Sequence, residues 1–459
     1  MNRSDFLAAL RATLGPDGLS TDPSDLTHWG RDWTRSLAPD PLAVVWPRDT
    51  AEVAAVVRAC AAAGTAIVPS GGRTGLAGGA VAAHGEVVLS LDRLRDIGPV
   101  DGLNRSVTVG AGVPNSVLQT ALVPHGLWWP VDLASKGSAT VGGNLATNAG
   151  GLRVLRYGHA RNWVLGVQVV WASGEITQLG GALHKDNSGY ALQQLLVGGE
   201  GTLGILTAAT LALAPLPGPS EVALVGVRDL GAAVALFGAL RQLPVVVNAF
   251  EALTDLCLEQ VIAHTGMARP LQPCATYALF DVENPRGADL AEWLAGQAGL
   301  VQDAALATDR TQADKLWSYR ERITESLQPR RPHKNDVSVP VSSMAGLAAE
   351  VAQWFATHRP GWQVALFGHV GDGNLHVNAL APSDLAQKDW RLACEQADQA
   401  LYGLVAARGG SLSAEHGIGL LKKPYLSITR PAAELAAMRA VKRALDPGNL
   451  LNPGKIFDL

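Results

Sequence analysis

The chain has 459 residues, of which 47% are hydrophobic, 17% charged and 5% aromatic. This length is sufficient for two or three domains with hydrophobic cores. Lys and Arg total 37 against 41 Asp and Glu, so the formal net charge is −4. Because no global positive field exists to bind phosphate backbones, we expect no nucleic-acid partner. The 50 glycines are clustered rather than periodic, which excludes a collagen-like chain and favours close backbone contact with a phosphate-bearing cofactor.

The cysteines and the N-terminus predict a cytoplasmic protein. The first 15 residues are typical of an amphipathic helix capped by Ser4, not of an export signal. The apolar run 230–240 is too short to span a bilayer, although peripheral membrane contact stays open. The cysteines lie far apart without a C-x-x-C pair, which favours a reduced compartment. They are Cys60, Cys257, Cys274 and Cys394.

Short β-rich runs alternate with helical patterns in the first half of the chain. A helix is predicted from Thr50 to the residue before Gly64, and the Ser-Gly turn within 164–179 predicts a hairpin. Strands are predicted at 42–47, 65–70, 86–91 and 106–113, and a further β-rich stretch at 205–220 ends in a Pro/Gly cluster.

A Pro/Gly cluster near residue 218 predicts a domain boundary. After it, a helix is predicted at 344–358, a strand at 363–370 and a final helix after Pro431. The fold class is therefore predicted to be α+β. The expected domains are 1–218, 219–425 and 426–459.

Two glycine-rich loops indicate a cofactor site. The segment 69–76, PSGGRTGL, follows a predicted strand, so its backbone N–H groups can form an anion nest for a pyrophosphate. The small and amide-bearing residues of 136–151 suit a backbone lying along a large planar ligand. Each loop alone is equally compatible with a tight turn, but two long loops in one domain favour a cofactor. The G-x-G-x-x-G match at 199–204 precedes a strand, which disfavours a Rossmann site.

A histidine pair and a distant carboxylate form a candidate metal site. His369 and His376 flank a Gly-Asp-Gly turn, and Glu415 follows in SAEHG. Two imidazoles and a carboxylate leave an open coordination position, as in catalytic divalent-metal sites. Spacing alone favours structural histidines instead.

A candidate anion-binding pair lies in the segment 317–324, WSYRERIT. This segment has helical character, and Arg320 and Thr324 at i and i+4 would share one face and bind one anion. The alternative on the charge pattern is a solvated basic face.

Several motifs in the same order resemble the FAD-linked oxidases of the vanillyl-alcohol oxidase/p-cresol methylhydroxylase fold, in the branch of D-2-hydroxyacid dehydrogenases. The resemblance implies an FAD domain of two α+β subdomains, a substrate or cap domain with an antiparallel sheet and the metal site, and a C-terminal helical segment that packs on the FAD domain. The motifs are PSGGRTGLAGG (69–79), PVDLASKGSATVGGNLATNAGGLRVLRYGH (130–159), KDNSGYALQQLLVGGEGTLGI (185–205), FGHVGDGNLHVN (367–378), SAEHGIG (413–419) and LDPGNLLNPGK (445–455).

The resemblance also implies which residues contact FAD. The first glycine loop would hold the pyrophosphate, the second would line the isoalloxazine and ribityl chain, and the third motif would lie near the adenosine. Neither glycine loop carries a His or Cys, so we expect non-covalent FAD. The implied residues are Pro69, Ser70, Gly71, Gly72, Arg73, Thr74, Gly75, Asp132, Ser138, Gly142, Thr147, Asn148, Gly151, Glu200, Gly201, Ile205 and Asn452.

The same resemblance favours a true metal site at His369, His376 and Glu415, with zinc expected first and manganese, iron or cobalt as alternatives. It implies that His416 is the general base that takes the substrate hydroxyl proton while a hydride leaves for flavin N5. The alternative for His416 is a hydrogen bond to the metal ligands. The residues implied to face the substrate carboxylates are Arg320, Thr324, Lys334 and Asn378.

The motifs resemble the D-2-hydroxyglutarate dehydrogenases more than the D-lactate dehydrogenases or the glycolate oxidase flavin subunits. Two separate cationic groups also suit a dicarboxylate. Asn335 replaces a frequent Tyr, which leaves the chain-length preference open. The alternatives are a D-lactate or broad-range D-2-hydroxyacid dehydrogenase, a flavoprotein subunit of a larger complex, and a non-enzymatic binding module. Expected partners are an electron-transferring flavoprotein, quinone or cytochrome as electron acceptor, and a second copy in a homodimer.

Overall fold

The computed structural model describes residues 2–284, 286–382 and 385–459, so Met1 of the predicted N-terminal helix lies outside the described residues. The chain forms two compact units. The first comprises Met1–Gly151, Tyr157–Leu216 and Glu415–Leu459, and the second comprises Leu152–Arg156 and Pro217–Ala414. Both units combine helices with sheets, which confirms the α+β class.

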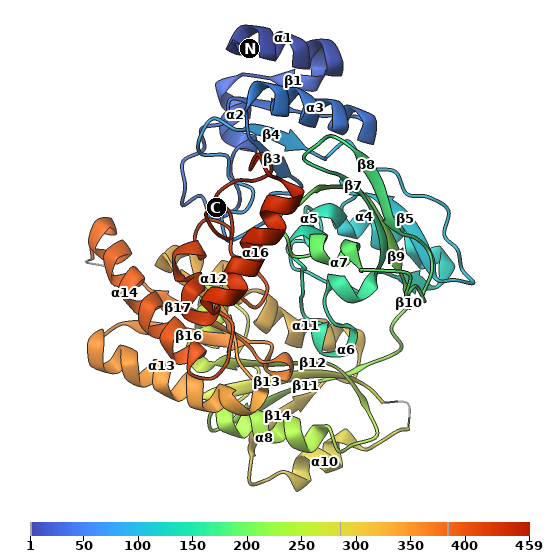
Figure 1. The fold of residues 1–459 in the computed structure, drawn as a ribbon. Helices are drawn as coiled ribbons and strands as arrows, with labels where there is room; N and C mark the ends of the chain where they lie inside the picture. Colours follow the sequence, from blue (N-terminus) through green and yellow to red (C-terminus); the bar gives the residue numbers. More distant parts are fainter. Residues whose placement is uncertain (1, 285, 383–384) are drawn as a thin grey trace. The chain divides into compact units, whose positions relative to one another are not determined.

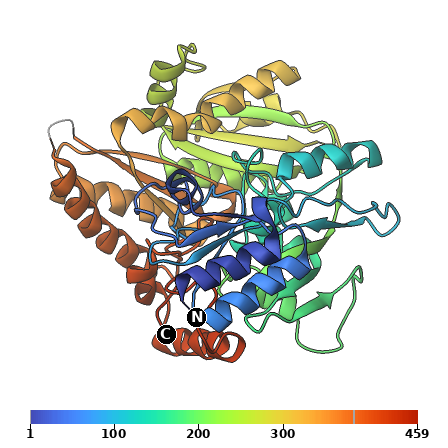
Figure 2. The ribbon, with the colours of Figure 1, turned by 90° about the horizontal axis from the view of Figure 1, so that it is seen from above.

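The first unit begins with a four-stranded sheet in the order β1-β2-β4-β3, of which β2, β4 and β3 are parallel. Helices α1 and α3 lie side by side against it (Figures 1 and 2). Helix α3 ends at Gly64 in the left-handed conformation, as predicted. The predicted Ser4 cap is wrong, because the Asn2 side chain accepts the Asp5 N–H and caps α1. The elements are α1 (Arg3–Leu14), β1 (Leu19–Ser20), α2 (Pro23–Trp29), β2 (Ala43–Val45), α3 (Thr50–Ala63), β3 (Ile67–Ser70) and β4 (Val87–Ser90).

An antiparallel sheet in the order β5-β9-β7-β8 follows in the same unit. The predicted hairpin is confirmed as β7 and β8. The C-terminal segment belongs to this unit too, since Leu451 bridges to Ile67 and its side chain joins the core beneath the first sheet. The elements are β5 (Ser106–Gly110), α4 (Asn115–Leu122), β6 (Leu127–Trp128), α5 (Val141–Ala146), β7 (Val164–Val170), β8 (Ile176–Gly180), α7 (Leu192–Leu196), β9 (Ile205–Ala212), β10 (Ala214–Pro215), α15 (Leu426–Thr429) and α16 (Ala432–Leu445).

The second unit is built on a seven-stranded antiparallel sheet in the order β14-β11-β13-β12-β16-β17-β15. Helices α9 and α11 cover one face, where Leu253, Tyr277 and Phe367 form the core with them. Helices α8 and α13 lie on the other face (Figure 1). The elements are α6 (Val154–Tyr157, whose last residue belongs to the first unit), β11 (Glu221–Val227), α8 (Leu230–Leu240), β12 (Val246–Thr254), α9 (Asp255–Thr265), β13 (Thr276–Glu283), α10 (Leu290–Gly296), β14 (Val301–Leu306), α11 (Arg310–Glu321), α12 (Ile323–Ser326), β15 (His333–Ser338), α13 (Met344–His358), β16 (Gln363–Gly368), β17 (Asn374–Leu380) and α14 (Gln387–Ala406).

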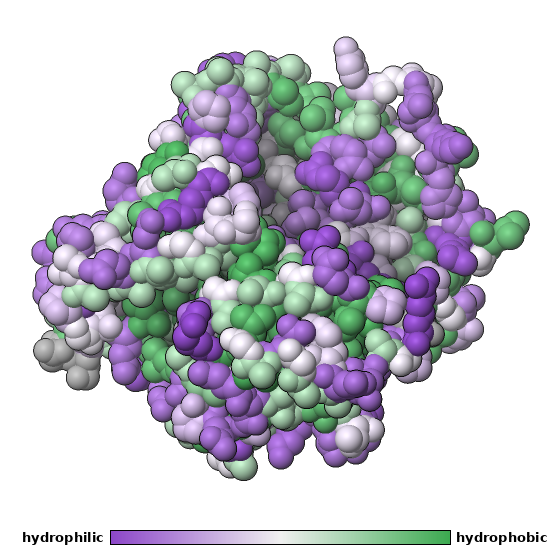
Figure 3. All heavy atoms as spheres, turned by 90° about the horizontal axis from the view of Figure 1, so that it is seen from below, coloured by the Kyte–Doolittle hydropathy of each residue, from purple (hydrophilic) through white to green (hydrophobic). Residues whose placement is uncertain are grey.

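The surface drawn in Figure 3 mixes hydrophilic and hydrophobic side chains. Among the described helices, none has the length and apolar character required to cross a bilayer.

Candidate active site

A pocket in the first unit gathers most of the residues predicted to bind the cofactor. It lies where β3 runs into the first glycine loop, beside the N-terminus of α5 and the segment that precedes β9. The predicted residues that line it are Pro69, Ser70, Gly71, Gly72, Arg73, Thr74, Gly75, Gly142, Thr147, Glu200, Gly201, Ile205 and His416. Residues that the sequence analysis did not select also line it, namely Ala77, Gly79, Ala80, Leu91, Thr140, Gly143, Asn144, Ala146, Leu196, Gly204 and Leu206.

Glycine is required where the two loops touch. A Cβ at Gly72 would lie 1.9 Å from the Ser138 carbonyl oxygen, so only glycine permits this approach. The backbone N–H groups of 72–75 donate no hydrogen bond within the described part of the chain, and the buried Ser70 hydroxyl finds no partner there either. These open donors fit the pyrophosphate of FAD.

The other residues predicted to contact the cofactor do not line this pocket. Asp132 pairs with Lys136 at 3.0 Å, and Asn148 accepts the Arg161 N–H through its side chain. Asn452 donates to the carbonyl oxygens of Gly79 and Glu200 and so ties the C-terminal segment to the pocket wall. Ser138 is exposed, and Gly151 packs on the Asp132 carbonyl.

Glu200 holds the turn that carries His416. Its buried carboxylate accepts the N–H groups of Ile418 at 2.7 Å and Gly419 at 2.8 Å. Burial raises the pKa of Glu200, and these two N–H groups oppose that rise. Since His416 lines the pocket two residues before Ile418, the carboxylate fixes the approach of this imidazole to the pocket.

Strands β15 and β17 align polar residues on one sheet face in the second unit. Lys334 pairs in register with Asn378, and Asp336 with His376. Because paired residues point to the same side of a sheet, these four side chains share the face that α9 and α11 cover. Burial lowers the pKa of Lys334, whose ammonium forms no ion pair with a described residue. This cation is therefore available to an anionic ligand.

A short turn brings the two histidines of the motif together. His369 follows β16, and His376 lies on β17 after the 3-10 turn Val370–Asp372. Gly373 has a φ of +87°, and a Cβ there would lie 2.2 Å from the Val339 carbonyl oxygen. The turn therefore requires glycine, and the imidazole centroids are 5.5 Å apart.

Glu251 on β12 connects His369 with Arg320. Its carboxylate is fully buried and lies 2.7 Å from His369 Nδ1 and 2.7 Å from Arg320 Nε. Burial alone would raise the pKa of Glu251, but His369 and Arg320 lower it below its usual value. Sequence reasoning missed this residue, although a single carboxylate within the apolar run VVNAFEALT was a usable signal.

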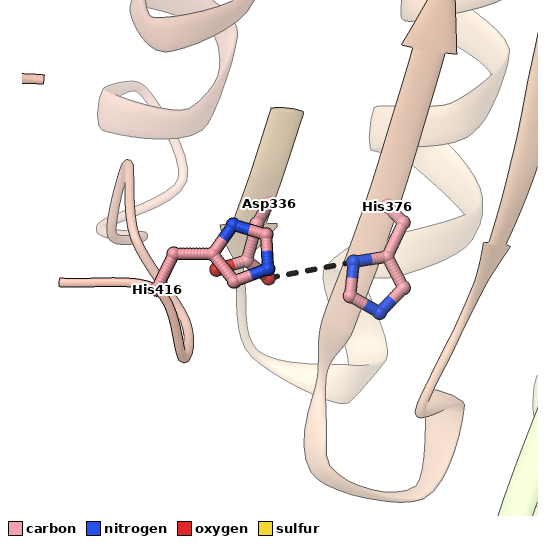
Figure 4. Close-up of side chains that lie close together, drawn as sticks. All are labelled: Asp336, His376 and His416. Atoms are coloured by element: carbon pink, nitrogen blue, oxygen red, sulfur yellow. Dashed lines mark ion pairs between the residues drawn. The ribbon is translucent and has the colours of Figure 1, made fainter. Parts of the chain in front are cut away.

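The chain passes Asp336 immediately before Glu415 and His416. The Ala414 N–H donates to Asp336 Oδ2 at 3.1 Å, and Glu415 and His416 are the next two residues. Figure 4 shows Asp336, His376 and His416 gathered, with the Asp336–His376 ion pair at 3.6 Å. Two groups have ligand atoms within 4.8 Å of one another: Asp336, His376 and His416, and His369, His376 and Glu415.

The second group fits a divalent metal better. Asp336 already accepts Asn374 Nδ2 at 2.7 Å and the Ala414 N–H, so it acts as a hydrogen-bonding partner of its neighbours. In His369, Nδ1 faces Glu251, so Nε2 is the ring nitrogen that would bind a metal. Two imidazoles and one carboxylate are the donor set of catalytic zinc sites.

The helical character predicted for 317–324 is confirmed on both sides of Arg322, but the shared helical face is wrong. The chain forms α11 and α12 with a break at Arg322. Arg320 is buried against Glu251, whereas Thr324 is exposed on α12. The two therefore do not share one continuous helical face.

Asn335 points away from the face of Lys334. Its side chain accepts from Tyr402 and donates to Asp398, both on α14. Asn335, which stands where Tyr is frequent in the resembling family, therefore contributes to the packing beneath α14. Its amide does not lie on the sheet face that carries Lys334.

Comparison with known proteins agrees with this arrangement. Residues 41–180 match the family model "FAD binding domain", and 216–456 match "FAD linked oxidases, C-terminal domain". The chain is 46% identical to D-2-hydroxyglutarate dehydrogenase of Xanthomonas citri pv. viticola over 96% of this chain and 94% of the relative. It is 37% identical to the Stutzerimonas stutzeri enzyme of that name over 98% of both chains. It is 35% identical to the mitochondrial enzyme of Bos taurus over 99% of this chain and 83% of the relative.

Solved structures share the fold. p-Cresol methylhydroxylase with substrate bound has a TM-score of 0.77 at 17% identity, over 99% of this chain and 97% of that chain. The 4-ethylphenol oxidase of Gulosibacter chungangensis has a TM-score of 0.77 at 16% identity with the same coverage. The expected two-part FAD-oxidase fold is confirmed.

Proposed function

Because this chain belongs to the FAD-linked oxidases, in the family of the D-2-hydroxyglutarate dehydrogenases, we propose that it oxidises D-2-hydroxyglutarate to 2-oxoglutarate. The observation that carries the proposal is the identity of 46% over 96% of the chain with a relative of that name. Two buried or half-buried cations, Arg320 and Lys334, support a substrate with two carboxylates.

The residues of the second unit bind and orient the substrate. Arg320 keeps its two terminal guanidinium nitrogens for the carboxylate next to the hydroxyl, since its Nε is used by Glu251. Lys334, with Asn378 opposite it and Thr324 as a further donor, binds the distal carboxylate. Pairing with that carboxylate offsets the cost of the half-buried ammonium.

His416 removes the proton of the substrate hydroxyl as the hydride leaves Cα. Its place on the pocket wall supports this role. FAD, held non-covalently by the glycine loops, supplies the hydride acceptor when bound. A divalent metal, zinc first among the candidates, supplies Lewis acidity toward the hydroxyl when bound by His369, His376 and Glu415.

The electrons then pass to a separate acceptor such as an electron-transferring flavoprotein or a quinone. We also propose a cytoplasmic or membrane-peripheral protein that forms a homodimer. The compartment rests on the cysteine pattern, and the acceptor and the homodimer rest on the family resemblance. Assays with each acceptor and sedimentation of the purified protein would test the acceptor and the homodimer.

The test of the function is anaerobic bleaching of the oxidised flavin band. The purified protein is mixed with D-2-hydroxyglutarate, its L enantiomer, D-malate or D-lactate, before and after treatment with EDTA. We expect stereospecific bleaching by D-2-hydroxyglutarate that EDTA abolishes. Faster bleaching by D-lactate would reassign the substrate to a monocarboxylate, and bleaching that survives complete metal removal would overturn the metal assignment.

A further inference from the structure

Glu251 contacts a histidine and an arginine at the same time. It lies on β12, in the middle of the seven-stranded sheet, and its side chain is fully buried. One oxygen faces His369 Nδ1 and the other faces Arg320 Nε, each at 2.7 Å. A buried charge is costly unless it is paired, and these two contacts pair the carboxylate.

The first contact fixes the tautomer of His369. An ionised carboxylate only accepts hydrogen bonds, so Nδ1 carries the proton and Nε2 is the ring nitrogen that can act as a metal ligand. Carboxylate–histidine pairs of this kind orient metal-binding imidazoles and raise their basicity.

The second contact fixes the guanidinium of Arg320. Its Nε is used by Glu251, and its Cζ lies 4.8 Å from the centre of the Phe367 ring. Glu251 thus holds the Nε edge of the guanidinium, and the Phe367 ring packs against its flat face. The two terminal nitrogens can then bind a ligand.

We propose that Glu251 is a positioning residue that couples the metal-binding imidazole of His369 to the substrate-binding guanidinium of Arg320. The inference rests on the proposed function, because it gives these two residues their roles. Glu251 itself touches neither ligand. One carboxylate aligns two groups that come from different elements, the turn after β16 and helix α11.

The Glu251→Gln variant tests this proposal, since a carboxamide offers one acceptor oxygen and cannot satisfy both partners. The first measurement is Zn²⁺ affinity, with the visible spectrum of the Co²⁺-loaded protein, in the absence of substrate. The second is KM and kcat for D-2-hydroxyglutarate at saturating metal. We expect metal affinity to fall about 10- to 100-fold and KM to stay raised even when the metal site is full.

The matched control is Asp398→Asn. Asp398 is also a buried carboxylate of the second unit that contacts a histidine, His333, at 2.7 Å, but its partners lie beneath α14. The Asp398→Asn variant should have the metal affinity and the KM of the wild-type protein. If Glu251→Gln fails to fold, Glu251→Asp is measured in the same way, with smaller changes expected in the same direction.

Unchanged metal affinity in Glu251→Gln, or a KM that returns to the wild-type value at saturating metal, would overturn the coupling. Equal losses in Asp398→Asn would overturn it too. A wild-type protein that binds metal but does not oxidise D-2-hydroxyglutarate would refute the proposed function, while the metal measurement would still report on Glu251 and His369.

Discussion

The carboxylate of Glu200 accepts the backbone N–H of Gly419 at 2.8 Å, although 219 positions separate them. The adjacent N–H of Ile418 binds the other carboxylate oxygen. Gly417 and Gly419 both have positive φ angles, so the backbone turns tightly around this carboxylate. The sequence resemblance implied a contact of Glu200 with the adenosine, and the structure gives this side chain a second task, since it anchors the turn after His416.

Replacement of Glu200 by Ala should uncouple this turn from the pocket. Two buried N–H groups lose their acceptor, at a cost of about 1–3 kcal/mol each. We expect a lower melting temperature and a lower rate of flavin reduction, measured by thermal denaturation and stopped-flow absorbance. Glu86→Ala is the control, because Glu86 is a buried carboxylate of the same unit that accepts the His84 N–H. An unchanged reduction rate in Glu200→Ala would contradict the anchoring role.

Replacement of His416 by Asn should separate proton removal from cofactor binding. A positioned general base contributes about 10²- to 10⁴-fold to a rate, so flavin reduction should slow by that order. FAD content should stay at the wild-type level, since the glycine loops supply most of the pocket wall. The measurement is the pH dependence of flavin reduction, in which the variant should lose the ionisation due to this base. Loss of FAD instead of loss of rate would make His416 a structural residue of the pocket.

Local signals made much of this molecule predictable. The helix that ends at Gly64 and the β7–β8 hairpin were found from residues adjacent in sequence. The turn at Gly373 was found in the same way, because a left-handed conformation demands glycine. The family motifs, which occur in the same order along the chain, indicated the FAD-oxidase fold. The fold class was therefore predicted correctly.

Contacts between distant residues were not predictable from the same signals. Glu251 lies 118 positions from His369 and 69 from Arg320, and no periodicity links them. The break at Arg322 was missed because the flanking sequence has helical character on both sides. The Asn335 side chain was expected near the substrate, but strand alternation turns it toward Tyr402.

Replacement of Lys334 by Ala should lower the affinity for dicarboxylates selectively. Loss of a charged hydrogen-bonding partner of a carboxylate costs about 1.5–3 kcal/mol, which is about a 10- to 150-fold rise in KM for D-2-hydroxyglutarate. KM for D-lactate should change little, because this substrate has no distal carboxylate. Lys388→Ala on the exposed surface of α14 is the control.

The lowered pKa of Lys334 predicts that substrate binding depends on pH. Burial lowers the pKa of Lys334, and only its charged form attracts the distal carboxylate. KM for D-2-hydroxyglutarate should therefore rise as the pH increases through this lowered pKa, and the rise should be absent in Lys334→Ala. An identical pH profile in both proteins would assign the distal carboxylate to another residue.

The contact of His333 with Asp398 predicts how stability varies with pH. Burial lowers the pKa of His333, but the hydrogen bonds and charge interactions with Asp398 and Cys394 together outweigh it and raise the value to about 10. Since the unfolded value is near 6.5, the folded protein binds the proton more tightly. The stabilisation is complete below about pH 6.5 and is lost as the pH rises toward about 10.

Asp398→Asn should remove this pH-dependent stabilisation. The difference in free energy of unfolding between wild type and variant should be largest near pH 6 and should shrink toward about pH 10, where the wild-type imidazole loses its proton. Urea denaturation at a series of pH values measures it. Asp314→Asn, which breaks the exposed pair with Arg310 on α11, should give a small difference. A difference for Asp398→Asn that is constant across this range would mean that the pair contributes by packing and hydrogen bonding of the neutral imidazole, not by its charge.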